Sequence, residues 1–294
     1  MTRINITAAR HSAFYTPLIY TIAGGFLAAE GLEPHYEPAK SPDDVTLKLV
    51  SGGFHLSQLA VSRSWGWIEK GETPPIKHFA QVNERDGFFL AGREADPAFD
   101  WKQLEGAEAI LDHGGQPLAM FKYACRRKGV DFARIKTIDA GNTSQMIAAF
   151  RGGRGAYVHL QGPAPQQLEH EGLGHVVASV GEAIGPVAFS SLAATPAWIE
   201  SAMAKAFMRA YAKARAELNA RPAAEIAKAE AAHFPGVAAE VLASTIAFYQ
   251  KSGAWAPAVA ISKASYEAAL DVFLAAGLIK RRHAFTDCVA PPPG

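Results

Sequence analysis

The feature that most constrains the fold of this chain is a repeated alternation of short apolar strands and amphipathic helices. In the first unit, an alternating run over residues 3–8 predicts a strand, and apolar residues at helical spacing follow Thr16-Pro17. Similar units continue to about residue 178, interrupted by a charged, turn-rich segment over residues 93–102. Strands that alternate with helices predict parallel sheets covered by helices on both faces.

The order of these units predicts two lobes. We expect residues 1–84 to form the first part of lobe 1 and residues 85–185 to form an inserted lobe 2. Residues 186–294 then return to lobe 1 as a crossover and an alanine-rich helical tail, which we expect to pack on lobe 1. The predicted class is therefore α/β, with a mainly parallel sheet flanked by helices in each lobe.

Composition excludes several classes of partner. The 294 residues carry a net charge of +1, which gives no reason to expect nucleic acid or an anionic membrane surface as partner. No apolar run is long enough to insert across a bilayer, and the two cysteines, Cys125 and Cys288, cannot make a disulfide framework. The first residues do not resemble a signal peptide, so we expect either a cytosolic protein or one whose leader has been removed.

The loop after the first strand is the strongest candidate for a binding site. It places His11, Ser12, Phe14 and Tyr15 between the end of a strand and the start of a helix. Ligands of open α/β sheets bind at the carboxyl ends of strands, and helix N-termini offer unpaired N–H groups. His11 would act there as a ligand donor or as a proton acceptor near neutral pH, and a solvated loop histidine is the alternative.

Two loops of the second series hold further candidates. Gly114 and Gly115 would let backbone N–H groups approach a ligand closely, and Gln116 adds a side-chain amide. A plain strand-to-helix turn is the alternative for this loop. Asn142 and Thr143 open the next helix, where they would cap its N-terminus, contact the ligand, or do both.

Polar residues in apolar strands complete the set of predicted ligand contacts. His55 follows a double glycine at the start of a strand, and His159 and Gln161 lie at the end of another strand. A satisfied, partly buried histidine is the alternative for His55. No spacing of histidine, cysteine and acidic residues matches a metal site, and no Ser-His-Asp or Gly-x-Ser-x-Gly arrangement is present. We therefore assign no catalytic residue, metal or cofactor.

Short motifs follow one another in a defined order between about Ile4 and Tyr266. They are Phe14-Tyr15-Thr16-Pro17-Leu18, Gly25-Phe26, Glu30-Gly31-Leu32, Leu49-Val50-Ser51-Gly52-Gly53, Leu104-Glu105-Gly106, Met146-Ile147-Ala148-Ala149-Phe150-Arg151-Gly152, Gly162-Pro163, Gly185-Pro186 and Ser190-Ser191-Leu192. In this order they resemble the periplasmic-binding-protein-like fold of type 2, in its nitrate/sulfonate/taurine and thiamine-pyrimidine-precursor branch. The resemblance implies two lobes, joined by two crossing segments, that close on a small molecule.

Two functions are compatible with this resemblance. The favoured one is the substrate-binding component of an ABC-type uptake system, which clamps a small polar or heteroaromatic molecule of the sulfonate, nitrate-like or thiamine-pyrimidine-precursor class. Few lysines or arginines are among the candidate residues, which favours a neutral or heteroaromatic ligand over a sulfonate. This function implies an ABC permease as partner and a periplasmic or lipid-tethered location. The alternative is a cytoplasmic enzyme on the same fold, acting on a small aromatic or heterocyclic substrate with His11 or His55 as general base.

Overall fold

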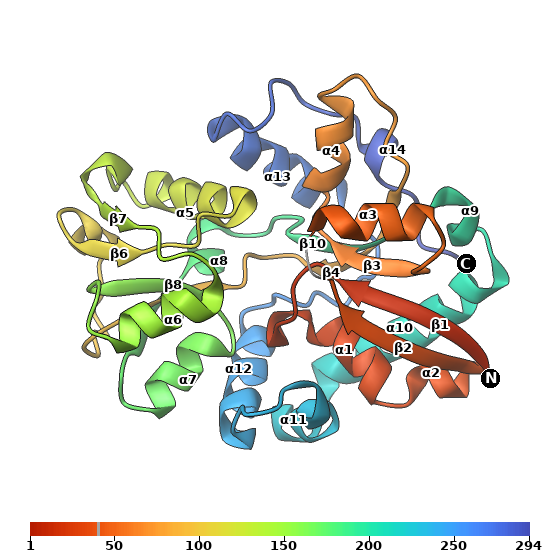
Figure 1. Cartoon of the computed structure of the whole chain (residues 1–294), viewed down its shortest axis with the longest axis horizontal. Helices are drawn as coiled ribbons and strands as arrows, with labels where there is room; N and C mark the ends of the chain where they lie inside the picture. The colour runs from red at the N-terminus through yellow and green to blue at the C-terminus, as the bar shows by residue number, and fades with distance from the viewer. Residues whose placement is uncertain (40–41) are drawn as a thin grey trace.

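The computed structural model describes residues 1–39 and 42–294, whose strands form two five-stranded sheets (Figure 1). The strands are β1 (Thr2–Ala8), β2 (Leu32–Pro38), β3 (Leu56–Leu59), β4 (Lys77–Asn83), β5 (Phe88–Gly92), β6 (Glu108–Ile110), β7 (Lys136–Ile138), β8 (Tyr157–Gln161), β9 (His175–Ser179) and β10 (Ser190–Ala194). The sheet of lobe 1 has the order β2-β1-β3-β10-β4, and that of lobe 2 has the order β7-β6-β8-β5-β9. The predicted two-lobed α/β fold is confirmed.

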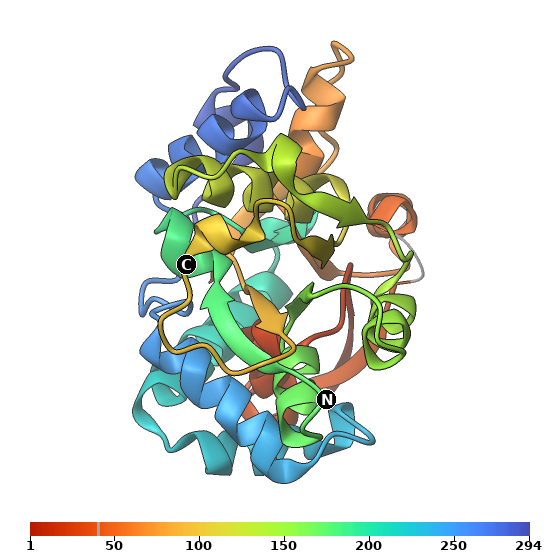
Figure 2. The same ribbon diagram turned by 90° about the vertical axis from the view of Figure 1, so that its left-hand side faces the viewer.

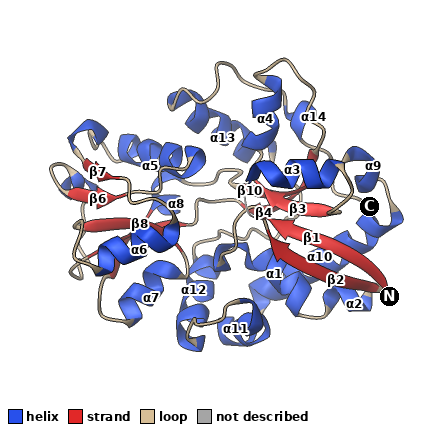
Figure 3. Ribbon diagram, viewed as in Figure 1, coloured by secondary structure: helices blue, strands red, loops and turns tan. Residues whose placement is uncertain are grey.

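Helices flank both sheets (Figure 3). They are α1 (Thr16–Ala23), α2 (Phe26–Ala29), α3 (Pro42–Val50), α4 (Ser62–Ile68), α5 (Gly115–Arg127), α6 (Thr143–Arg151), α7 (Ala164–His170), α8 (Val180–Ile184), α9 (Pro196–Ile199), α10 (Ala202–Ala220), α11 (Ala223–Glu230), α12 (Ala239–Lys251), α13 (Lys263–Ala275) and α14 (Phe285–Cys288). Short 3₁₀ turns lie at Ala13–Tyr15, Trp101–Leu104, Phe132–Arg134 and Ala231–His233. Within the described residues, no helix is both long and apolar enough to cross a bilayer.

One strand in each sheet runs against the other four. In lobe 1, β10 pairs antiparallel with β3 and β4, whereas β1 pairs parallel with β2 and β3. In lobe 2, β5 pairs antiparallel with β8 and β9, whereas β6 pairs parallel with β7 and β8. Each antiparallel strand is the one that follows a crossing from the other lobe, through residues 84–87 or 185–189. The carboxyl ends of the remaining strands therefore share one edge of each sheet.

The helical tail contacts both lobes, which is more than the expected packing on lobe 1. Helix α10 packs against α1 of lobe 1, while α12 contacts α7 and α13 contacts α5 of lobe 2. In Figure 2 the tail passes along both the upper and the lower parts of the molecule. The hydroxyl of Tyr249 in α12 donates to the carbonyl of Gly87 (2.7 Å) and accepts from the amide of Gly162 (3.0 Å). One tail side chain thus holds a crossing segment and lobe 2 together.

Candidate functional site

A cavity of about 430 Å³ lies between the two lobes. Its volume is in the range of small-molecule sites. Lobe 1, lobe 2, the second crossing segment and the tail all contribute to its wall. The lining residues are Ala9, Arg10, Tyr15, Gln58, Leu59, Ala60, Ser62, Arg63, Phe88, Gly114, Gly115, Gln116, Pro117, Phe189, Phe273 and Leu278.

The lining is built largely on the carboxyl ends of parallel strands. Arg10 follows β1, Gln58 lies near the end of β3, and Gly114 follows β6. Since β1 and β3 are parallel neighbours, their ends open on the same side of lobe 1. The end of β6 faces them from lobe 2. This is the position in which α/β sheets bind ligands.

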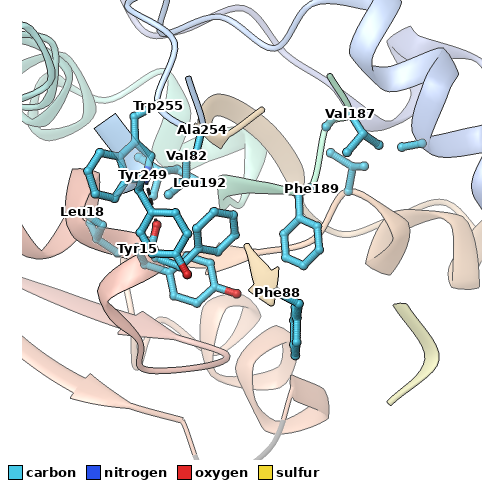
Figure 4. Packing of buried hydrophobic residues seen from close by; sticks show 14 of the residues in the cluster. Tyr15, Leu18, Val82, Phe88, Val187, Phe189, Leu192, Tyr249, Ala254 and Trp255 are labelled. Carbon is cyan, nitrogen blue, oxygen red and sulfur yellow. Dashed lines mark hydrogen bonds between the residues drawn. The ribbon is translucent and has the colours of Figure 1, made fainter. Parts of the chain in front are cut away.

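The first loop is fixed by hydrogen bonds before any ligand arrives. The hydroxyl of Ser12 accepts from the amide of Phe14 (3.1 Å), which caps a 3₁₀ turn. The carbonyl of Phe14 accepts from Asn83 Nδ2 (2.6 Å) and from Trp255 Nε1 (3.0 Å). Figure 4 shows the neighbouring Tyr15 close to the buried aromatic rings. The loop therefore presents Tyr15 to the cavity from a rigid base.

Asp112 connects this loop to the facing helix. Its Oδ2 is 2.8 Å from Nη1 of Arg10, and its Oδ1 accepts from the amide of Gly114 (2.9 Å) at the start of α5. Burial alone would raise the pKa of Asp112, but the Arg10 guanidinium and the Gly114 amide outweigh burial and lower it. A Cβ at Gly114 would lie 3.0 Å from Oδ1, so a glycine keeps this turn tight.

An aromatic wall closes another side of the cavity. The rings of Phe88 and Phe189 (Figure 4) lie 6.4 Å apart. The guanidinium of Arg10 is 5.4 Å from the Phe88 ring centre. Behind the wall, His159 stacks on Phe88 at 4.5 Å and also contacts Phe121 at 5.0 Å. Burial lowers the pKa of His159 to about 3, so the ring is neutral. The stack sets the position of Phe88.

Several buried polar groups near the cavity have atoms without a hydrogen-bond partner among the described residues, including Gln58, Asp86, His159 and Gln161. Gln58 donates from Nε2 to Ser190 Oγ (2.6 Å), which leaves its Oε1 unpartnered. Asp86 accepts from the amide of Phe88 through Oδ1 (2.6 Å), which leaves Oδ2 unpartnered. Burial raises the pKa of Asp86 to about 7. Of these residues, Gln58 lines the cavity, although its Oε1 is itself buried.

Direct contacts hold the lobes together around the cavity. Besides the ion pair of Arg10 with Asp112, they include three hydrogen bonds. Ser12 Oγ donates to the carbonyl of Gly162 (2.6 Å), and Gln161 Nε2 donates to the hydroxyl of Tyr15 (3.4 Å). The third is the bond from Ser62 Oγ to Gln116 Oε1 (3.2 Å). The two lobes are therefore in direct contact around the cavity.

The structure brings most of the predicted contacts to the cavity or to the layer beneath it. Tyr15, Gly114, Gly115 and Gln116 are lining residues. Four others are buried just behind the lining, in the contacts described above: Ser12, Phe14, His159 and Gln161.

The other four predicted residues lie outside the lining. His11 packs on the tail: its Nδ1 is 2.9 Å from the Tyr36 hydroxyl and its Nε2 is 2.7 Å from the His233 carbonyl. Burial lowers the pKa of His11, although that carbonyl opposes the shift. His55 lies at the opposite end of β3, where its Nδ1 accepts from the Asn5 amide (2.8 Å).

Asn142 and Thr143 open α6 on the surface of lobe 2. Asn142 Oδ1 accepts from the amide of Gln145 (3.1 Å), and Gln145 Oε1 accepts from the amide of Asn142 (2.8 Å). This reciprocal capping box satisfies two N–H groups at the helix N-terminus. The capping interpretation accounts for Asn142.

The sequence interpretation did not include several lining residues. Among the described residues, Arg10 and Arg63 place two cations at the cavity, and neither was among the expected contacts. Gln58 had a signal in the sequence, since it is a polar residue within an apolar run. Phe88 and Phe189 had none, because the pattern around them is that of ordinary core residues. Among the described residues, no group of three or more histidine, cysteine or acidic side chains could hold a metal ion.

Comparison with known proteins gives one consistent result. The family model described as "NMT1/THI5 like" matches residues 13–225. The curated protein "Putative binding protein YtlA" of Bacillus subtilis (strain 168) is 28% identical over 274 residues, which cover 91% of this chain and 81% of that protein.

Solved structures share the fold at low sequence identity. The alkanesulfonate-binding protein SsuA from Xanthomonas axonopodis pv. citri has a TM-score of 0.75 at 15% identity, covering 99% of each chain. The ligand-binding component of an ABC-type import system from Staphylococcus aureus also scores 0.75 at 15%, covering 99% of this chain and 97% of that one. The periplasmic nitrate-binding protein NrtA from Synechocystis PCC 6803 scores 0.65 at 15%, covering 96% and 86%. The sequence resemblance is confirmed, and this chain belongs to the NMT1/THI5-like family.

Proposed function

We propose that this protein is the substrate-binding component of an ABC-type import system and clamps a small molecule between its two lobes. The observation that carries the proposal is a cavity lined from both lobes and rimmed by contacts that cross between them. In this proposal, residues 85–185 move as one body on the crossing segments, and closure removes the ligand from water. Polar groups buried by closure would then discriminate through the cost of leaving them unpaired.

Relatives support the transport role. Their names describe an alkanesulfonate-binding protein, a periplasmic nitrate-binding protein and a ligand-binding component of an ABC-type import system. By analogy, we place this protein on the outer side of the cytoplasmic membrane, with an ABC permease as its partner. Two lobes that share the ligand suit this role, because a permease can distinguish a closed protein from an open one.

The enzyme alternative has less support. It needs His11 or His55 as general base, and a base must lie within hydrogen-bond reach of the substrate. Both ring nitrogens of His11 already have partners in lobe 1 and the tail, and His55 lies at the end of β3 away from the cavity. The lining residues offer amide, hydroxyl, guanidinium and aromatic groups, which can bind a ligand through hydrogen bonds and ring contacts.

A melting screen tests the proposal with two variants. We expect a bound compound at 100 times its Kd to stabilise the wild type by about 2.7 kcal/mol, which is a shift of roughly 5 °C. Tyr15→Ala removes a lining residue and should abolish most of the shift. His11→Ala lies outside the lining and should retain it. A shift lost equally in both variants would contradict this assignment, as would a small-angle scattering profile that no compound makes more compact.

A further inference from the structure

We propose that the Asp86 side chain, in the first crossing segment, couples the separation of the two lobes to pH. Its uncharged carboxyl group is buried while the lobes are in contact, and its ionisation favours their separation. This inference rests on the proposed function, because it concerns how the clamp opens. It assigns a role to a residue outside the cavity lining and names no ligand.

The carboxyl group of Asp86 is buried and only partly satisfied. The residue is 3% exposed, and its Oδ1 accepts from the amide of Phe88 (2.6 Å), the first residue of β5. Its Oδ2 has no hydrogen-bond partner among the described residues. A buried carboxylate costs far more free energy than a buried neutral carboxyl group. The site therefore favours the protonated form of Asp86.

Groups from both lobes and from the tail surround this carboxyl group. Burial raises the pKa of Tyr15 in lobe 1 and of Tyr249 in α12, and a charge on Asp86 adds to both shifts. Tyr249 also donates to the carbonyl of Gly87, the next residue of the segment (2.7 Å). From lobe 2, α8 packs so closely that a Cβ at Gly181 would overlap the Asp86 carbonyl oxygen. Separation of the lobes removes part of this cover and admits water, which favours the charged form.

Two charged side chains act on the Asp86 carboxyl group, and their effects oppose each other. Burial is the main cause that raises the pKa of Asp86 to about 7; Asp112 raises it further, and Arg10 lowers it. Arg10 and Asp112 come from different lobes and are paired with each other at 2.8 Å. While the lobes are in contact, this pair therefore gives an Asp86 carboxylate little net attraction.

The other charged residues of the neighbourhood do not neutralise Asp86. In its own segment, Glu84 accepts from the Ser262 hydroxyl (3.3 Å), and Arg85 is placed so that a Cβ at Gly253 would lie 3.8 Å from its Nε. Both belong to contacts with the tail. In α8, Glu182 is exposed. Among the described residues, no cation is therefore at bonding distance from the Asp86 carboxyl group.

The direction of the pH dependence follows from the two forms. With the lobes in contact, Asp86 has a pKa of about 7, whereas a carboxyl group in water has a pKa of about 4. The form with the lobes in contact thus binds more protons between these values. We expect its ratio to the open form to fall as pH rises toward 7, by up to about tenfold for each pH unit.

Small-angle scattering of the ligand-free protein from pH 5 to pH 9 tests the inference. The radius of gyration of the wild type should increase as pH rises, and the increase should end slightly above pH 7. Asp86→Asn keeps an acceptor for the Phe88 amide without a charge and should stay compact at every pH. Glu84→Gln, the matched control, removes a half-buried carboxylate from the same segment and should follow the wild type.

The outcomes separate this inference from the proposed function. A wild-type profile that is the same at every pH would overturn the inference, as would an Asp86→Asn protein that expands over the same pH range as the wild type. Should Asp86→Asn not fold, Asp86→Ser, which is also uncharged, replaces it. Either result leaves a ligand-clamping protein in place. Failure of every compound of the melting screen to make the wild type more compact at pH 8 would instead count against the proposed function.

Discussion

Two turns at the same edge of the lobe 2 sheet have the same local chemistry and different surroundings. After β6, Asp112 accepts from the amide two residues on, and after β7, Asp139 does the same. Both distances are 2.9 Å, and a helix starts within four residues of each aspartate. Yet the Asp112 side chain is 12% exposed and faces Arg10, whereas Asp139 is 62% exposed, with His113 at 3.9 Å.

The position of the strand in the sheet explains the difference. Strand β6 lies inside the sheet, between β7 and β8, whereas β7 is at its edge. The turn after β6 therefore meets lobe 1 across the cavity, and the turn after β7 points to solvent beside it. A turn motif gives a local geometry, but the opposite lobe decides whether that geometry becomes a site.

The largest expected change in stability comes from replacing these two aspartates, one at a time, by alanine. Asp112→Ala leaves Arg10 without its partner and should lower the free energy of unfolding by about 2–3 kcal/mol, since a partly buried charge stays unpaired and the Gly114 amide loses its acceptor. Asp139→Ala removes an exposed acceptor and should cost about 0.5 kcal/mol. Chemical denaturation measures both values. Equal losses of unfolding free energy in the two variants would show that the ion pair of Asp112 with Arg10 adds no stability.

A third carboxylate, Asp86 in the first crossing segment, sharpens the comparison because it is buried without a cation at bonding distance among the described residues. Its pKa is about 7 in the folded protein and about 4 in the unfolded chain, so the folded state binds more protons between these values. Stability from this group is full below pH 4 and is lost as pH rises toward 7. Asp86→Asn should match the wild type near pH 4 and exceed its unfolding free energy by about 2 kcal/mol at about pH 5.5, since each unit of pKa difference is worth about 1.4 kcal/mol. A constant difference across this range would contradict the assignment.

A smaller effect than that of Asp86→Asn is expected at the helix cap in the turn after β7. Asn142→Ala breaks the capping box of α6 and should cost about 1 kcal/mol of unfolding free energy. The affinity for whichever compound the melting screen identifies should not change, because Asn142 lies outside the cavity lining. A tenfold loss of affinity at unchanged stability would make this turn part of the site.

Much of the fold could be predicted from the sequence because its signals are local. The strand of residues 3–8, the loop after it and the helix after Thr16-Pro17 agree with β1, the 3₁₀ turn and α1. Contacts of the tail could not be predicted in the same way. Helices α12 and α13 each have an apolar stripe, and the stripe alone does not indicate which lobe the helix packs against.

The site was predictable only in part, and for the same reason. Tyr15 and the Gly114-Gly115 turn follow strands, so the rule of carboxyl ends found them. That rule also excludes His55, which lies at the amino end of β3. Arg10 also follows a strand, but its pairing with Asp112, which is 102 residues away in the sequence, could not be predicted. The hydrophobic periodicity of the sequence does not indicate such a pair.

The double hydrogen bond of Tyr249 to Gly87 and Gly162 has a consequence for how this protein can diversify. Tyr249 is not among the lining residues, yet it holds the crossing segment on which we propose that the lobes turn. In this proposal, ligand selectivity and the ease of lobe opening depend on different segments of the sequence. A chimera that receives α12 from a relative should keep its ligand selectivity, while the rate at which it releases the ligand changes.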